Sequence, residues 1–286
     1  MKPDYITVSF SGGKDSTAML LRMIELGEHI DEVINIDTGM EFPAMYDHIE
    51  RVRRIVEDHG ITYTTLRGEH TYEYYLLEVP IKSEKYGDHH GYGWTSVNCR
   101  WCTKLLKLKP LAQHLKDLRD GYNVIECIGL ACDETKRLSR THNTNKNHRH
   151  PLVEWGWSES DALEYCRNLG FDWGGLYDLF NRVSCWCCPL ASISELRKLW
   201  KHYPELWKKL EEWETQMGRP DTGKRGAYWF KDKTTVFDLS KRFELEESRL
   251  SKGMMIDSPG FYQNLRRAVT PLPEKQTVLS IEEGSE

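Results

Sequence analysis

A short glycine turn joins an apolar, β-branched run to an amphipathic run near the start of the chain. The first run, Tyr5-Ile-Thr-Val-Ser-Phe10, predicts a strand, and a helix is expected directly after Ser11-Gly-Gly-Lys-Asp-Ser16. A strand that enters a helix through such a turn directs several backbone N–H groups and the positive helix end to one point. Residues 11–16, called the glycine loop below, therefore predict a phosphate or pyrophosphate site.

The residue types of the glycine loop fit this interpretation. Gly12 and Gly13 allow positive φ and close approach of a ligand to the backbone. Lys14 supplies a mobile cation, and Ser11 and Ser16 supply hydroxyl groups. The spacing matches neither the Walker A motif nor the dinucleotide fingerprint G-x-G-x-x-G, so those two classes of nucleotide site are excluded.

Strand and helix patterns alternate through the first half of the chain. The expected strands are 4–10, 32–37, 61–66 and 122–130, and the expected helices are 15–27, 43–59 and 102–118. Such alternation predicts a Rossmann-like α/β fold, in which helices cover both faces of a parallel sheet. Ligands of these sheets bind beyond the carboxyl ends of the strands.

Three polar segments follow expected strands at that edge. They are the glycine loop, Asp37-Thr-Gly39, and Gly129-Leu-Ala-Cys-Asp-Glu-Thr-Lys-Arg137. Because the carboxyl ends of parallel strands share one edge, we expect these segments to converge. An acidic residue such as Asp37 suits an adenosine ribose or base, and Arg137 suits a phosphate or sulfate group.

The glycine loop resembles the PP-loop, Ser-Gly-Gly-x-Asp-Ser, of the adenine-nucleotide α-hydrolase superfamily. With residues 37–43 and 129–137, the chain resembles the phosphoadenosine phosphosulfate (PAPS) reductase family from about residue 4 to residue 200. The resemblance implies a PP-loop (HUP-type) fold, ATP or an adenylyl sulfate as ligand, Mg²⁺, and catalytic roles for Lys14, Asp15 and Arg137. It implies a nucleotide site formed by Ser11, Gly12, Gly13, Lys14, Asp15, Ser16, Asp37, Thr38, Gly129, Asp133 and Arg137.

Two C-x-x-C pairs lie about 80 residues apart in the chain. Cys99 with Cys102, and Cys185 with Cys188, offer the ligand set of a four-sulfur metal site. Spacing leaves both zinc and a [4Fe–4S] cluster open, and the resemblance favours the cluster, which family members hold near these positions. Cys132 and Cys187 are candidate reactive thiols, since both lie beside predicted site residues.

The resemblance leaves three hypotheses about function. The first is ATP-dependent adenylation, forming AMP and pyrophosphate, with sulfur transfer to an unidentified acceptor for which RNA or DNA is a candidate. The second is a sulfonucleotide reductase that releases sulfite. The expected C-terminal Glu-Cys-Gly-x-His segment, with its attacking cysteine, is missing from the sequence given. The third is a nucleotide-binding subunit of a nucleic-acid modification complex.

Composition limits the remaining possibilities. Net charge is −5 and 29% of the 286 residues are charged, which excludes a chain that is basic throughout, as many nucleic-acid binders are. No apolar run reaches the length of a membrane span, so we expect a cytoplasmic protein. A sulfur-donor protein or thiol reductant, and a second copy in a homodimer, are candidate partners. The predicted organisation is an α/β domain over 1–150, a helical extension over 151–217, and a mostly helical region over 218–286 that ends in a disordered tail.

Overall fold

The chain forms two compact units, Met1–Lys233 and Thr234–Glu286. The structure, a computed structural model, describes residues 2–84, 87–141, 145–217, 229–231, 233–257 and 259–269. Segments 1–150 and 151–217 both fall in the first unit. The division into three parts stays a prediction. The two units are described separately below.

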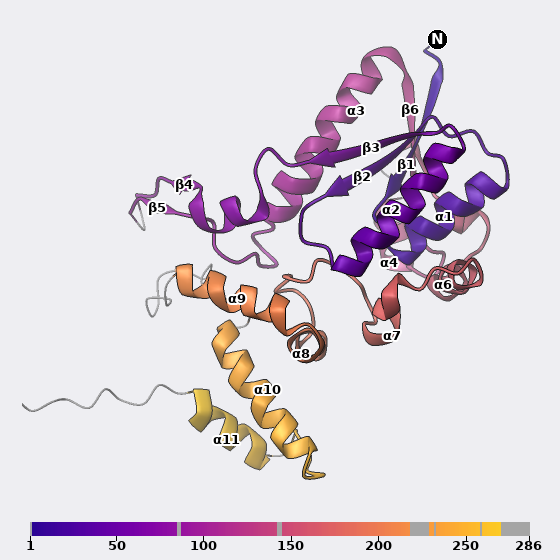
Figure 1. The fold of residues 1–286 in the computed structure, drawn as a ribbon. Helices are drawn as coiled ribbons and strands as arrows, with labels where there is room; N and C mark the ends of the chain where they lie inside the picture. The colour runs from indigo at the N-terminus through magenta and orange to yellow at the C-terminus, as the bar shows by residue number, and fades with distance from the viewer. Residues whose placement is uncertain are drawn as a thin grey trace, which may run out of the picture. The chain divides into compact units, whose positions relative to one another are not determined.

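The first unit is built on a five-stranded parallel sheet (Figure 1). Its strands are β1 (Asp4–Phe10), β2 (Glu32–Asp37), β3 (Thr62–Arg67), β6 (Asn123–Ile128) and β7 (His148–Arg149). Val8 of β1 pairs with Val33 on one side and with Cys127 on the other, and all three are fully buried. The predicted parallel sheet is confirmed, and the four long strands lie within two residues of their expected bounds.

Helices and short strands complete the first unit. They are α1 (Lys14–Glu25), α2 (Pro43–Asp58), η1 (Tyr74–Glu78), β4 (Pro80–Ile81), β5 (His89–His90), η2 (Thr103–Leu108), α3 (Lys109–Gly121), α4 (Thr135–Thr141), α5 (Pro151–Glu154), α6 (Glu159–Asn168), η3 (Trp173–Gly175), α7 (Leu176–Leu179), α8 (Ile193–His202) and α9 (Pro204–Met217). The segment between η1 and η2 contains the small antiparallel β4–β5 ladder. The expected helix 102–118 begins as the π-helical turn η2 and continues as α3.

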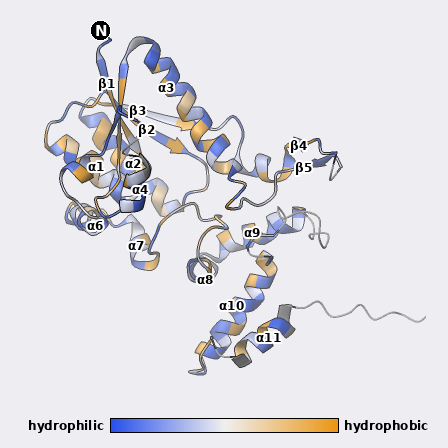
Figure 2. Cartoon of the chain, turned by 180° about the vertical axis from the view of Figure 1, so that it is seen from behind, coloured by the Kyte–Doolittle hydropathy of each residue, from blue (hydrophilic) through white to orange (hydrophobic). Residues whose placement is uncertain are grey.

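Helices cover both faces of the sheet, as the alternating pattern predicts. Figure 1 shows α1 and α2 on one face and α3 on the opposite face. Leu115 of α3 packs on Ile34 and Val124, and all three are buried. Figure 2 shows the hydrophobic residues concentrated on the strands and on the helix sides that face them. Burying each such aliphatic side chain contributes roughly 1.5–3 kcal/mol.

The strand order of the parallel sheet is β3-β2-β1-β6-β7. The order in which strands are added reverses at β1, because β2 and β3 lie on one side of it and β6 and β7 on the other. The connections α1 and α2 extend the sheet to one side of β1, whereas α3 returns the chain to the other side of β1. Ligands of doubly wound sheets bind in the crevice outside the carboxyl ends of the strands at such a reversal. The glycine loop follows β1, and residues 129–137 follow β6. Both therefore lie at this crevice.

The second unit contains two helices, α10 (Val236–Leu250) and α11 (Pro259–Val269). Thr235 caps α10, because its side chain accepts from the Asp238 N–H while Asp238 accepts from the Thr235 N–H. Both helices lie in the C-terminal region that the sequence predicts to be mostly helical. The tail predicted to be disordered, 270–286, lies outside the described residues. Among the described residues, no helix is both long and apolar enough to cross a membrane.

Candidate functional site

The glycine loop makes a tight turn against α2. Gly12 has φ of +79°, and a Cβ at this position would lie 2.7 Å from Met45 Sδ and 2.8 Å from Ile49 Cγ1. Only glycine satisfies both the positive φ and the close approach. Gly13 then adopts an extended conformation as the N-cap of α1. The turn brings the chain directly from the end of β1 to the first amides of the helix.

Hydrogen bonds within the glycine loop hold its two serines together. Ser16 Oγ accepts from the Ser11 N–H at 3.2 Å and donates to the Gly13 carbonyl at 3.0 Å. Ser11 Oγ lies 3.0 Å from Ser16 Oγ. The N–H groups of Asp15 and Ser16 form no hydrogen bond with a described residue. These first-turn amides, at the positive end of α1, are donors for an anion.

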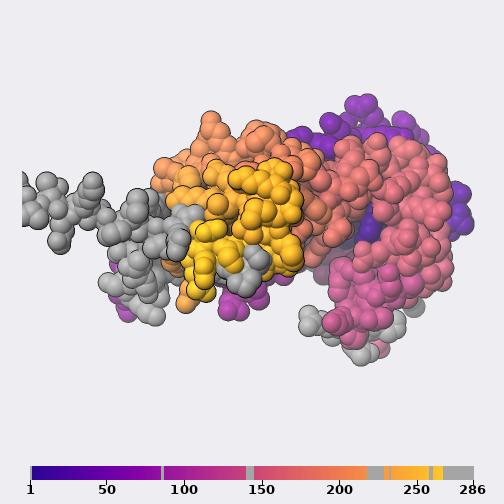
Figure 3. Space-filling model, turned by 90° about the horizontal axis from the view of Figure 1, so that it is seen from below, coloured from indigo at the N-terminus to yellow at the C-terminus, as the bar shows by residue number. Residues whose placement is uncertain are grey.

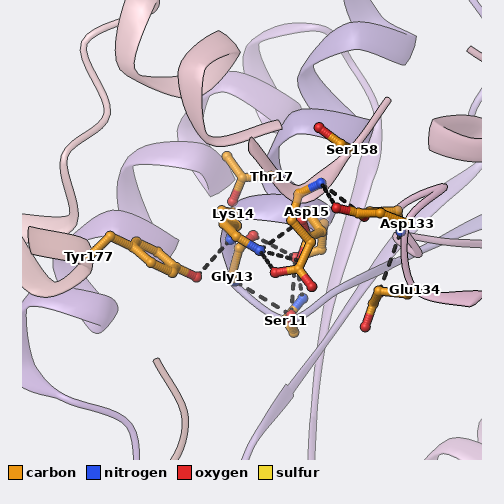
Figure 4. Close-up of polar contacts among 12 residues, drawn as sticks. Ser11, Gly13, Lys14, Asp15, Thr17, Asp133, Glu134, Ser158 and Tyr177 are labelled. Carbon is orange, nitrogen blue, oxygen red and sulfur yellow. Dashed lines mark hydrogen bonds and ion pairs between the residues drawn. The ribbon is translucent and has the colours of Figure 1, made fainter. Parts of the chain in front are cut away.

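Lys14 of the glycine loop is buried, with 9% of its surface exposed. Its ammonium lies 3.1 Å from both carboxylate oxygens of Asp15 and 2.5 Å from Glu159 Oε2 (Figure 4). Burial acts to lower the pKa of Lys14, but the hydrogen bonds and charges of these two carboxylates outweigh it and raise the pKa. Lys14 therefore stays charged at neutral pH.

Acidic side chains from three segments of the chain gather around the Lys14–Asp15 pair. Burial raises the pKa of Asp15, Lys14 opposes the rise, and Glu159 and Glu134 add to it. Asp133 accepts from the Glu159 N–H at 3.1 Å, which ties the start of α6 to the turn after β6. A site with one buried cation and several carboxylates matches the needs of a phosphate group with its bound Mg²⁺.

The turn after β6 meets the glycine loop directly. A Cβ at Gly129 would lie 2.8 Å from Ser16 Cα, so the absence of a side chain allows the two segments to touch. Two of the three predicted strand-end segments thus converge. Arg137, predicted to bind phosphate, lies in α4, pairs with Glu134 at 2.5 Å, and has 63% of its side chain exposed. Figure 3 shows N-terminal residues in indigo within a hollow between salmon and magenta segments.

The third segment, Asp37-Thr-Gly39, is held by contacts of its own. Asp37 accepts from Arg67 Nε, from the Tyr46 hydroxyl and from the Gly39 N–H. Both oxygens of Asp37 therefore have protein partners, and a ribose would compete with Arg67 for this carboxylate. Thr38 Oγ1 lies 3.9 Å from Cys185 Sγ. The sequence does not predict this link between the strand end and the second cysteine pair.

Four cysteines lie close enough for their charges to interact, and we call them the thiol cluster: Cys102, Cys185, Cys187 and Cys188. Cys185 Sγ contacts Glu41 Oε1 at 3.6 Å, and Lys107 lies 3.9 Å from the same oxygen. Burial, with the charge of Glu41, raises the pKa of Cys185 to about 12, against the opposing charge of Lys107. Metal binding at this thiol would therefore displace a proton.

The predicted ligands are only partly assembled in the structure. Cys102, Cys185 and Cys188 belong to the thiol cluster, whereas Cys99 is exposed. Cys187, predicted as a candidate reactive thiol, is fully buried in the cluster. Within the described part of the chain, no three His, Cys, Asp or Glu side chains lie close enough to bind one metal ion. The donor atoms suit zinc or an iron–sulfur cluster, but their positions do not form a ligand shell.

The model of the "Phosphoadenosine phosphosulfate reductase domain" family matches residues 5–191, more than half of the chain. The chain belongs to the PAPS reductase domain family. The matched residues include the glycine loop, the thiol cluster and the whole parallel sheet except Asp4, the first residue of β1.

The chain is also similar to several individual proteins, at identities of 30% or below. Two uncharacterized proteins of Methanocaldococcus jannaschii are 30% and 28% identical over 72% and 71% of this chain, which spans 40% and 46% of their lengths. An adenosine 5'-phosphosulfate reductase of Bacillus cytotoxicus is 25% identical, over 60% of this chain and 68% of that protein. A solved structure, the U34-tRNA thiolase NcsA of Methanococcus maripaludis with its [4Fe–4S] cluster, overlays with a TM-score of 0.40 at 14% identity and covers 95% of this chain and 79% of that one.

Several contacts of the site in this PAPS reductase domain were not predicted from the sequence. Glu159 reaches Lys14 from α6, Trp173 Nε1 donates to the Gly12 carbonyl at 2.7 Å, and the Tyr177 hydroxyl accepts from the Lys14 N–H at 2.9 Å. The partners are about 145 to 163 residues apart in the chain, beyond the reach of local patterns. The Gly174-Gly175 pair is the one local signal of an unusual backbone there.

A pocket of about 230 Å³ lies behind the glycine loop, next to α2. It is lined by Ala44, Asp47, His48, Arg51, Phe171, Asp172, Trp173 and Gly174. His48 is buried, packs against Trp173 in a tilted arrangement with ring centroids 4.6 Å apart, and hydrogen-bonds Thr17 Oγ1 at 3.0 Å. Burial, with a smaller effect from Arg51, lowers the pKa of His48 to about 4.

The low pKa of His48 predicts an acid-sensitive fold. Between the folded value of about 4 and the unfolded value of about 6.5, the unfolded chain binds more protons, so stability falls as the pH falls. At pH 5 the free energy of unfolding should be about 2 kcal/mol lower than at pH 7 from this residue alone. Urea unfolding at both pH values measures this. His48→Gln, which keeps a donor for Thr17 but does not titrate, should show a correspondingly smaller pH effect; an equal pH effect in both proteins would contradict the assignment.

Proposed function

We propose that the chain binds ATP at the glycine loop and activates an acceptor by adenylation, with release of pyrophosphate, before sulfur transfer. The observation that carries this proposal is the position of buried, charged Lys14 beside the unpaired amides of Asp15 and Ser16. These groups lie at the crevice between β1 and β6, where a phosphate chain would meet both a cation and a helix N-terminus.

The proposed first step is phosphoryl chemistry at the α-phosphorus. An acceptor oxygen forms a bond to the α-phosphorus as the bond to the bridging oxygen breaks, and pyrophosphate leaves. A sulfur nucleophile from a donor protein or thiol then displaces AMP from the activated acceptor. Lys14 would leave its ion pairs with Asp15 and Glu159 to stabilise the charge that develops on the phosphate oxygens.

The carboxylates around Lys14 are the proposed binding residues for Mg²⁺. When bound, the ion would neutralise part of the negative charge of the phosphate chain. Asp15 has a raised pKa because it is buried, and a divalent cation would favour its ionised form. Glu134 and Asp133 approach from the turn after β6. Arg137 would leave its ion pair with Glu134 and bind an anionic oxygen of the ligand instead.

The thiol cluster is the proposed site of a [4Fe–4S] cluster, with zinc as the alternative. Cys102, Cys185 and Cys188 would supply three ligands, and Cys99 or Cys187 the fourth. When bound, an iron–sulfur cluster would hold or present the sulfur that is transferred. Lys107 and Glu41 lie next to Cys185. The positive charge of Lys107 would offset part of the negative charge of the thiolate ligands.

Two unpaired arginines support an anionic acceptor. Arg100 and Arg182 are exposed, and the charges of both act on Cys188. Neither guanidinium group forms an ion pair or hydrogen bond with a described residue, whereas Arg67, Arg119 and other arginines of the first unit pair with carboxylates. Free guanidinium groups beside the thiol cluster suit the phosphates of RNA or DNA.

A sulfonucleotide reductase is the second candidate function. The 25% identical relative named adenosine 5'-phosphosulfate reductase supports it, because the match covers 68% of that protein. A cysteine would attack the sulfur of the phosphosulfate, form a thiosulfonate and release AMP, and a thiol reductant would then free sulfite. Cys132 and Cys187 are the candidate nucleophiles. Cys187 is fully buried, which disfavours it in this role.

Product analysis separates these functions. An anaerobic preparation is incubated with ATP and, separately, with adenylyl sulfate or phosphoadenylyl sulfate plus a thiol. Pyrophosphate and AMP from ATP, in the presence of an acceptor RNA pool, is the expected result. Sulfite from a sulfonucleotide would instead identify a reductase. Tight nucleotide binding without either product would leave the chain as a nucleotide-binding subunit and would contradict the proposed catalysis.

A further inference from the structure

Tyr177 of α7 lies at the mouth of the glycine loop. Its hydroxyl oxygen accepts a hydrogen bond from the Lys14 N–H at 2.9 Å and lies 3.5 Å from the place that a Cβ of Gly13 would occupy. Figure 4 shows the ring extending toward Lys14 from the side opposite Asp133 and Glu134. The hydroxyl is thus the hydrogen-bond partner of the first amide of α1. It lies next to the amides of Asp15 and Ser16, which have no partner among the described residues.

The backbone that carries Tyr177 is held in an uncommon conformation. Trp173, Gly174 and Gly175 have consecutive positive φ values of 52°, 59° and 80°. Positive φ at a tryptophan is strained, and it persists only where surrounding contacts enforce it. The indole of Trp173 donates to the Gly12 carbonyl and packs against the Tyr177 ring at 4.8 Å in a T-shaped arrangement. These contacts fix the hydroxyl with respect to the glycine loop.

The hydroxyl proton of Tyr177 has no acceptor among the described residues. A phenol donates one hydrogen bond as well as accepting, and here the oxygen accepts from Lys14 while no described group takes its proton. Burial raises the pKa of Tyr177, with a smaller opposing effect from the Lys14 amide, so the proton is retained at neutral pH. The Tyr177 O–H is therefore a hydrogen-bond donor at the N-terminus of α1 that has no acceptor among the described residues.

We propose that Tyr177 binds the phosphate chain directly, donating its hydroxyl proton to a ligand oxygen while the Lys14 N–H holds the hydroxyl in place. This inference rests on the proposed nucleotide site at the glycine loop and adds a residue that its motif does not contain. The Tyr177 hydroxyl would thus connect the Lys14 N–H to a ligand oxygen through two successive hydrogen bonds. The amides of Asp15 and Ser16 and the ammonium of Lys14 would contact the other oxygens of the same ligand.

The test is the affinity of Tyr177→Phe for pyrophosphate and for ATP, each measured by titration calorimetry with Mg²⁺. The variant keeps the ring on Trp173 and removes only the hydroxyl. A hydrogen bond to a charged group corresponds to roughly a tenfold to hundredfold loss of affinity. Tyr203→Phe is the matched control, because the Tyr203 ring packs on Phe42 and Phe180 in the same unit and its hydroxyl has no hydrogen-bond partner among the described residues. It should bind as wild type does.

Unchanged or tighter binding by Tyr177→Phe, with wild-type binding intact, would overturn the role of Tyr177 and leave the nucleotide site standing. A wild-type chain that binds neither probe would overturn the nucleotide site and this inference with it. If the Phe variant unfolds, Tyr177→Met replaces it, since an unbranched side chain can fill the space without a hydroxyl. Thermal melts confirm that each variant is folded, and the same loss of affinity is expected from either one.

Discussion

Lys14→Ala is expected to abolish pyrophosphate release from ATP, with a fall in rate of at least about a hundredfold. The physical reason is the position of the ammonium, which is the buried cation at the helix N-terminus and is held between Asp15 and Glu159. Without it, the charge that develops on the phosphates would face several carboxylates alone. The measurement is the initial rate of pyrophosphate formation at saturating ATP, so that weaker binding is separated from slower chemistry.

Two further variants make this result interpretable. Lys14→Arg keeps the charge but changes its shape, and should restore part of the activity that Lys14→Ala loses. Lys109→Ala removes an exposed lysine paired with Glu69 and should leave the rate unchanged. Removing Lys14 also leaves half-buried Asp15 without its cation, so the free energy of unfolding must be measured for each variant. A folded Lys14→Ala protein with full activity would exclude the glycine loop as the catalytic centre.

The parts of the site that follow from the sequence are those encoded within a few residues. The strand before the glycine loop, the two glycines and the helix start are set by local propensity and turn chemistry, and β1 has its expected bounds. The convergence with Gly129 also follows, because the carboxyl ends of parallel strands share an edge. The fold class, and the edge of the sheet at which the two segments meet, are therefore predictable from the sequence pattern.

The remaining contacts depend on side-chain packing between distant segments. Glu159 and Tyr177 reach Lys14 from parts of the chain that the motif does not include. Asp37 lies at the predicted strand end, yet Arg67 of the neighbouring strand occupies one of its oxygens. Cysteine spacing could not show that Cys187 is buried with the predicted ligands while Cys99 is exposed. Which side chains pair, and which are buried, depends on the packing of segments that are distant in the chain. Local sequence patterns do not give that packing.

Serine substitution at Cys185 or Cys188 is expected to remove the metal from an anaerobic preparation. Both thiols lie in the thiol cluster, and loss of one ligand from a four-sulfur site leaves an incomplete shell. Iron and zinc content by mass spectrometry, with absorbance near about 400 nm for an iron–sulfur cluster, measures the loss. Cys132→Ser is the matched control, since Cys132 follows β6 outside the cluster, and its metal content should equal that of wild type.

Cys99→Ser and Cys187→Ser then identify the fourth ligand. The ligand set predicted from the sequence requires Cys99→Ser to lose metal and Cys187→Ser to retain it, and the opposite result would transfer the role to buried Cys187. Since no three candidate ligands converge among the described residues, binding must draw the thiols together, and the metal-bound form should melt at a higher temperature than the chelator-treated form. Equal melting temperatures, or metal retained in both Cys185→Ser and Cys188→Ser, would rule out a structural metal at the thiol cluster.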